Sequence, residues 1–132
     1  MKYFTFHEME RSDKAAQLGI DNSIPEELKD NVRVLVERVL DPLRQAWGRP
    51  IHVNSGYRGP AVNKAVGGSR TSHHLRGMAA DITTFNVVDN RRLFQLILDL
   101  HLPFTQLIDE RNFSWVHVSL DPNDIRHEIK KL

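Results

Sequence analysis

Apolar residues recur every three or four positions in two stretches of the chain, a spacing typical of helices that bury one face. The first series consists of Leu28, Val32, Leu35, Val39 and Leu43. A capping-box pattern, Ser-Ile-Pro-Glu, begins at Ser23, and Pro42 lies near the end of the series. We therefore predict a core helix that begins after Ser23 and bends near Pro42.

The second helical series consists of Leu93, Leu96, Ile97 and Leu100. Asp89 lies where a residue would cap this helix, and Pro103 lies where the helix would end. A shorter helix is expected to follow Pro60 and to stop at Gly67 and Gly68.

Four segments have the composition and spacing of strands. Residues 51–53 alternate in polarity, and residues 78–83 are small and apolar apart from one carboxylate, Asp81. Residues 104–110 and 115–120 follow one another closely enough to form a hairpin. Because helices come first and antiparallel strands later, without regular βαβ alternation, we predict an α+β fold with a small antiparallel sheet flanked by helices.

The composition limits the class of protein. The 132 residues, 40% hydrophobic and 27% charged, fit one domain over residues 1–132. A formal net charge of +1 leaves no excess of positive charge that would indicate a nucleic-acid groove or a membrane surface as a partner. The polar segment 124–132 is expected to form a short solvated helix. No apolar run is long enough to span a bilayer, and the first residues lack the core of a secretory signal, so we expect synthesis in the cytoplasm.

The chain has no cysteine, so a metal site would use His, Asp or Glu side chains. The densest polar segment is 72–81. His74 and Asp81 of this segment, with His117, would supply the three protein ligands of a catalytic zinc, whose fourth position is left for water. Taken alone, each residue is more often structural, since an Asp commonly caps a turn and a His is commonly solvated or hydrogen-bonded.

A specific pattern, Ser-x-His-x-x-Gly-x-Ala-x-Asp, is met by Ser72, His74, Gly77, Ala79 and Asp81. Ser-Gly-Tyr-Arg precedes it at residues 55–58, and Trp-Val-His follows at residues 115–117. In this order the motifs resemble the zinc D-alanyl-D-alanine peptidase family, which includes D,D-carboxypeptidases, vancomycin-resistance D,D-dipeptidases and phage endopeptidases of peptidoglycan. The resemblance implies a Hedgehog/DD-peptidase-like fold whose sheet carries the zinc site, and it points to the phage-associated branch.

The resemblance also assigns the metal ligands. His74 and Asp81 match the first two zinc ligands of the family, and His117 matches the third. His73, which is adjacent to His74, is the rival ligand, although the register of the motif favours His74. Gly77 would let the loop between His74 and Asp81 turn sharply, because glycine tolerates a positive φ.

Further residues match substrate-handling positions. Arg58 matches the family arginine that steadies the substrate carbonyl oxygen as it becomes an oxyanion, a task that suits a planar and permanently charged group. Ser72 matches a serine that holds substrate by hydrogen bonds, and capping of its own loop is the alternative role. Tyr57 and Trp115 are expected to line the substrate groove.

The general base has two candidates. Close relatives often have an acidic residue two or three positions before the last His, where this chain has none. The phage-associated branch has a Gln-Leu-Ile-x-Glu segment, which the chain matches and which selects Glu110, with Asp109 as the alternative. A four-residue hairpin loop would put Glu110 opposite Trp115 and on the same face as His117, whereas an odd-length loop favours Asp109.

Together these features predict a zinc metallopeptidase that hydrolyses peptide bonds containing D-amino acids in bacterial peptidoglycan, as a carboxypeptidase or as a stem-peptide endopeptidase. Its partners would be the stem peptides of peptidoglycan, and we expect it to bind neither nucleic acid nor membrane. We expect a monomer that acts on the cell wall after phage-type lysis. The alternative is a non-catalytic module that keeps the zinc and binds protein or wall fragments. A structural phage protein that grips peptidoglycan without turnover is a third possibility.

Overall fold

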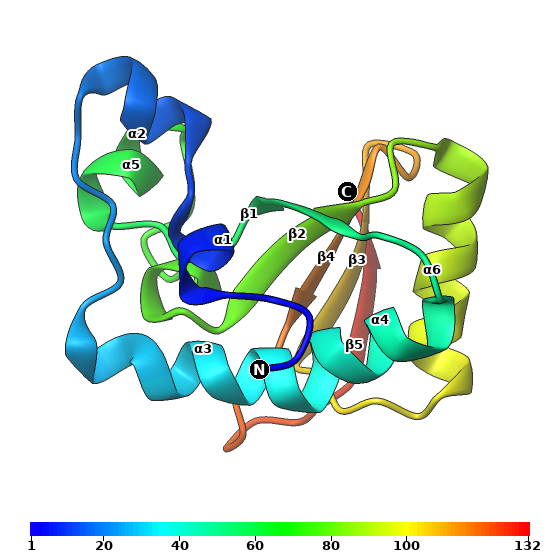
Figure 1. Ribbon diagram of the computed structural model, residues 1–132. Coiled ribbons are helices and arrows are strands. Elements are labelled where there is room, and N and C mark those ends of the chain that lie inside the picture. The colour runs from blue at the N-terminus through cyan, green and yellow to red at the C-terminus, as the bar shows by residue number, and fades with distance from the viewer.

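A five-stranded sheet crosses the molecule in the strand order β1-β2-β4-β3-β5 (Figure 1). The computed structural model describes residues 1–132. Neighbouring strands are antiparallel, except that β5 runs parallel to β3. The strands are β1 (His52–Ser55), β2 (Ala79–Thr83), β3 (Gln106–Glu110), β4 (Trp115–Ser119) and β5 (Glu128–Lys131).

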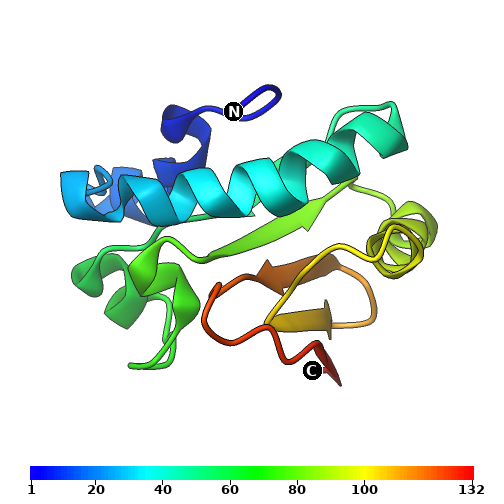
Figure 2. The same cartoon turned by 90° about the horizontal axis from the view of Figure 1, so that it is seen from below.

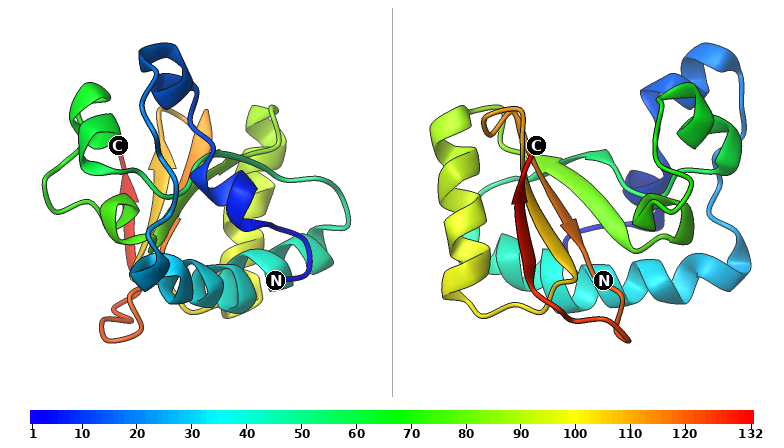
Figure 3. Two further views of the ribbon diagram at one scale, coloured as in Figure 1. Left: turned by 60° about the vertical axis from the view of Figure 1, so that its left-hand side comes forward. Right: turned by 180° about the vertical axis from the view of Figure 1, so that it is seen from behind.

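One long helical segment, made of α3, η2 and α4, lies along one face of the sheet (Figure 2). α6 stands at one end of the molecule, and α2 and α5 lie together at the other end (Figure 3). None of these helices combines the length and the apolar character that crossing a bilayer requires. The helices are α1 (Phe6–Glu10), α2 (Asp13–Leu18), η1 (Glu26–Leu28), α3 (Lys29–Leu35), η2 (Val36–Leu40), α4 (Asp41–Trp47), α5 (Pro60–Ala65), η3 (His73–Arg76) and α6 (Val87–Asp99).

The two faces of the sheet have different surroundings. Alternate strand residues such as Ile82, Leu107 and Val116 are buried in one core with the apolar faces of the helices. Because successive side chains of a strand point to opposite faces, Asp81 and His117 point away from this core. The fold class predicted from the sequence is confirmed, and the polar residues of the motifs gather on the face without the long helix.

The long helix contains one π-helical turn, η2, directly before α4 and Pro42. The N–H of Asp41 donates to the carbonyl of Val36, five residues earlier. Proline has no N–H, and its ring would clash with the carbonyl four residues before it, that of Arg38. The wider π turn therefore allows the helix to continue through Pro42.

The starts of both long helices differ from the prediction. Ser23 forms no capping box: its hydroxyl donates to Asp21 at 2.6 Å, and the helix begins at η1 without a side-chain cap. In α6 the cap is Asn86, whose side chain accepts from the N–H of Asp89 at 2.9 Å. Asp89 lies in the first turn instead, where its negative charge favours the helix N-terminus.

The hairpin of β3 and β4 has the predicted register. Glu110 pairs with Trp115 and Ile108 pairs with His117, across a loop of four residues. Three residues of this loop have left-handed backbone conformations, with φ between 48° and 61°. The carboxylate of Asp109 accepts the N–H of Phe113 at 2.6 Å, so this side chain stabilises the turn.

The segment predicted as a solvated helix after residue 124 forms strand β5 instead, and that prediction is wrong. β5 pairs with the outer edge of β3, whose N–H and C=O groups would otherwise lack partners. The sheet is therefore mixed rather than purely antiparallel. The strand was hard to recognise because Ile129 is 54% exposed and Lys130 is exposed, so no apolar alternation marks a buried face.

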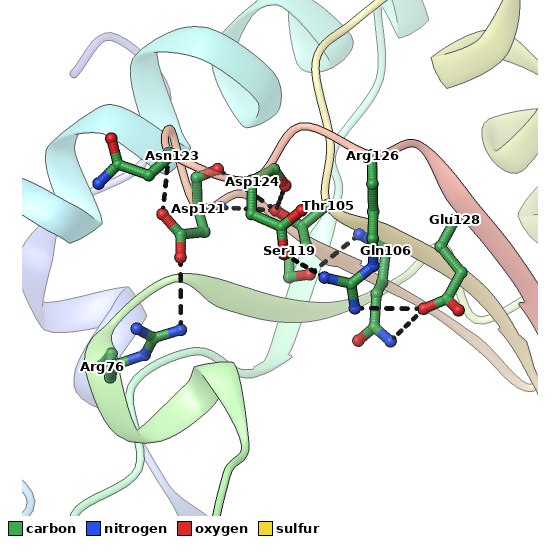
Figure 4. Close-up of polar contacts among 9 residues, drawn as sticks. All are labelled: Arg76, Thr105, Gln106, Ser119, Asp121, Asn123, Asp124, Arg126 and Glu128. Carbon is green, nitrogen blue, oxygen red and sulfur yellow. Dashed lines mark hydrogen bonds and ion pairs between the residues drawn. The ribbon is translucent and has the colours of Figure 1, made fainter.

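Polar side chains fasten the connection between β4 and β5 to the sheet (Figure 4). The hydroxyl of Thr105 accepts the N–H of Asp121 at 2.8 Å and donates to the carbonyl of Asp124 at 2.7 Å. Gln106 donates to Glu128 at 2.7 Å, which holds β5 beside β3. These contacts replace the hydrophobic packing that an exposed edge strand lacks.

We expect Gly77→Ala to destabilise the protein more than Gly19→Ala. Both glycines have a positive φ, which costs an alanine about 1–2 kcal/mol. A Cβ at Gly77 would also lie 2.7 Å from Cγ2 of buried Val32, and such overpacking adds about 1–3 kcal/mol, whereas Gly19 faces open space. Urea unfolding of both variants measures the difference, and equal losses of stability would contradict it.

Candidate active site

A cleft of about 880 Å³ opens on the polar face of the sheet. Residues of all five strands line it, together with the segments around α2, α5 and η3. Most of the residues selected from the motifs line this cleft: Arg58, Ser72, His73, His74, Asp81, Glu110, Trp115 and His117. The sequence motifs, which lie up to about half the chain apart, therefore converge on one surface.

Tyr57 does not line the cleft, contrary to the prediction. Its side chain is 5% exposed and belongs to the hydrophobic core. The backbone explains this placement, because the N–H of Tyr57 donates to the carbonyl of Met9 at 2.7 Å and its carbonyl accepts from Asn22 at 3.0 Å. These contacts with the N-terminal segment direct the ring inward, and the neighbouring Arg58 faces the cleft.

Strand pairing brings the candidate ligands together. Asp81 of β2 is directly opposite His117 of β4, and Oδ1 of Asp81 lies 2.9 Å from Nδ1 of His117. His74 comes from η3, where Ser72 caps the turn by accepting the N–H of His74. One ligand atom from each of the three residues lies within 4.8 Å of the others. His73, the rival ligand, lines the cleft but lies outside this group.

The imidazole of His74 is held in one tautomer. Its Nδ1 lies 2.6 Å from the carbonyl oxygen of Gly56, which can only accept, so Nδ1 carries a proton and, in the neutral imidazole that binds a metal, Nε2 carries the lone pair. Nε2 is buried, has no hydrogen-bond partner and lies 3.3 Å from Oδ2 of Asp81. A histidine whose far nitrogen donates to a carbonyl is the usual arrangement of a metal ligand, so this orphaned nitrogen fits a bound cation.

The Asp81 carboxylate is the centre of charge in the group. Burial raises its pKa, but the electrostatic attraction of the neighbouring imidazoles and the hydrogen bond with His117 outweigh burial and hold the pKa well below its usual range. Asp81 is therefore ionised at neutral pH. Two imidazoles and one carboxylate with an open side toward a cleft form a donor set that fits catalytic zinc.

Gly56 is a functional position that the sequence reasoning did not single out. The segment around it contacts His74 twice, because the carbonyl of Gly56 accepts from the imidazole and the N–H of Arg58 donates to the carbonyl of His74 at 3.0 Å. A Cβ at Gly56 would lie 2.5 Å from the carbonyl oxygen of Met9. The Ser-Gly-Tyr-Arg motif contains this glycine and is the sequence signal for it. Gly56 acts through its backbone carbonyl, since it has no side chain.

The two candidate bases have different surroundings. Glu110 lines the cleft, and its pKa is raised, first by burial and then by the negative charge of Asp81. Asp109 is 6% exposed, points to the other face and is engaged by the N–H of Phe113. Only Glu110 therefore presents a carboxylate to the candidate metal group.

The family model described as Peptidase M15 matches residues 2–119, which include every candidate ligand and both candidate bases. The chain therefore belongs to the Peptidase M15 family, and the resemblance seen in the sequence motifs is confirmed. Membership in this family supports a peptidase activity, and the His74, Asp81 and His117 side chains have the donor atoms to hold a metal ion. No curated protein matches the chain.

We expect the protein to bind one zinc ion through His74, Asp81 and His117. Metal analysis of His74→Ala and His117→Ala should find zinc lost, whereas His73→Ala should retain it. Because histidine binds zinc through an unprotonated nitrogen, zinc affinity should fall as the pH is lowered. Full occupancy in His74→Ala together with loss in His73→Ala would reverse the assignment.

Proposed function

We propose that the protein is a zinc-dependent peptidase that hydrolyses peptide bonds containing D-amino acids in peptidoglycan stem peptides. One observation carries this proposal: the buried, unpartnered Nε2 of His74 faces Asp81 and His117 at the floor of a cleft that also holds Glu110 and Arg58. Bound zinc would supply Lewis acidity, which lowers the pKa of water and polarises a carbonyl.

Glu110 is the general base of this proposal. Its carboxylate would take the proton of the attacking water and return it to the leaving amine. The raised pKa, which follows from burial and from Asp81, suits both steps, because a base that works near neutral pH must also be able to act as an acid.

Arg58 stabilises the negative charge that develops on the carbonyl oxygen. Its side chain lines the cleft and makes no ion pair, so its donors are free for a substrate. Burial lowers its pKa, and Asp81 opposes this shift. Because arginine stays protonated at any physiological pH, the guanidinium provides a permanent positive charge.

Cations around the cleft support an anionic peptide as the substrate. Lys14, Arg111 and Lys130 line it without a carboxylate partner, and the guanidinium of Arg111 lies 5.3 Å from the ring centroid of Trp115. Stem peptides carry free carboxylates, so they complement this charge. The proposed place of action is the cell wall, where such peptides are found.

Glu110→Gln should retain zinc and stability but lose turnover on muropeptides by about 10²- to 10⁴-fold, since it removes the proton acceptor. Asp109→Asn is the matched control. It keeps an oxygen that can accept from Phe113, so it should remain active and change mainly the stability of the hairpin. Mass spectrometry of digested peptidoglycan measures turnover, and an active Glu110→Gln with an inactive Asp109→Asn would transfer the role to Asp109.

Arg58→Ala should lower kcat by about 10²- to 10³-fold, more than it weakens binding of the substrate, because an oxyanion donor acts mainly in the transition state. Arg58→Lys should restore only part of the rate, since an ammonium does not reproduce the planar fork. Kinetics on a purified muropeptide separate kcat from KM. Intact muropeptides after prolonged incubation with zinc-loaded wild type would favour the non-catalytic binding module instead.

A further inference from the structure

The guanidinium of Arg58 has no polar anchor. Its Nε is buried without a hydrogen-bond partner, and the side chain forms no ion pair. Only its backbone is held by a hydrogen bond, because the N–H of Arg58 donates to the carbonyl of His74. Arginine has several rotatable bonds, so a defined position must come from the groups packed around it.

Gly68 packs close to this guanidinium. A Cβ built on Gly68 would lie 2.9 Å from Nη1 of Arg58 and 2.1 Å from Oδ1 of Asn63. Both distances are far below ordinary contact, so neither side chain could keep its place beside an alanine. Gly68 therefore leaves the space in which the Arg58 guanidinium and the Asn63 amide lie next to each other.

Asn63 offers a buried acceptor at the same point. Its side chain is 5% exposed, and its Nδ2 donates to the carbonyl of Ser69 at 3.0 Å. The carbonyl of Asn63 accepts the N–H of Gly68 at 2.8 Å, which fixes the loop after α5 against this residue. Its Oδ1, however, is buried and has no partner. A buried acceptor without a donor is unfavourable, and the nearby guanidinium is the group that can satisfy it.

We propose that Asn63 and Gly68 are positioning residues for Arg58. Gly68 provides the space, and Oδ1 of Asn63 accepts from Nη1 of Arg58 when a substrate draws the guanidinium into its working position. The remaining N–H groups then face the cleft. This inference rests on the proposed function, because it concerns the geometry of the oxyanion donor.

The decisive variant is Gly68→Ala, and Gly67→Ala is its matched control. Gly67 is adjacent and has a φ of 72°, so alanine there is strained, but its Cβ would meet nothing within 4 Å. The control therefore reports the cost of strain in the same loop without displacing Arg58. Asn63→Ala tests the acceptor separately.

The first readout does not require activity. In ¹H–¹⁵N NMR spectra, the Arg58 Nε–H signal, assigned by its loss in Arg58→Ala, should shift and exchange faster with solvent in Gly68→Ala. In Gly67→Ala it should stay unchanged. An unchanged Arg58 signal in Gly68→Ala would overturn the proposal, whether or not the protein hydrolyses any peptide.

The second readout is the rate of muropeptide hydrolysis. We expect Gly68→Ala to lower kcat by about 10²-fold, as misplacement of a catalytic group by about 1 Å does, with KM and zinc content nearly unchanged. Asn63→Ala should lower kcat in the same manner, and Gly67→Ala should not. In an Arg58→Ala background, Gly68→Ala should have no further effect, because its target is gone. An equal loss with and without Arg58 would contradict a positioning role.

Discussion

The hydrogen bond between the imidazole of His74 and the carbonyl of Gly56 is the contact on which the rest of the site depends. It spans 18 residues of sequence and joins the loop after β1 to η3. It also decides which nitrogen of His74 has a lone pair, and it leaves that nitrogen pointing at Asp81. A backbone carbonyl thus determines the chemistry of a side chain, and the N–H of Tyr57, which belongs to the same peptide group, holds that carbonyl in place by donating to Met9.

The two faces of the sheet have different roles, one in the hydrophobic core and the other in the cleft. Residues of one parity along β2, β3 and β4 pack with the helices, and residues of the other parity line the cleft. A shift of one residue in the pairing of β3 with β4 would exchange Glu110 for Asp109 in the cleft and would place an apolar residue outside. The hydrophobic core and the choice of candidate base are therefore fixed by the same register.

Much of the fold and of the candidate site could be predicted from sequence, because helical spacing, hairpin parity and motif order are local or periodic signals. The hairpin that presents Glu110 and the helix from Leu28 to Leu43 are examples. Two of the failures have a common physical origin. Tyr57 is turned inward by backbone contacts with distant residues, and β5 is stabilised by its partner strand rather than by its own apolar pattern. Such long-range backbone pairing leaves no periodic trace in the chain.

Strand β5 pairs in parallel with β3 at the edge of the sheet and forms one wall of the cleft. This wall lies apart from the hydrophobic core. Lys130 reaches the cleft from a strand whose side chains are mostly exposed and whose attachment is polar. Substitutions on β5 can therefore alter the charge of that wall without disturbing the packing beneath the candidate metal ligands. In the proposed peptidase, the residues assigned to catalysis thus lie on the inner strands, and β5 offers an exposed surface whose charge can change at little cost in stability.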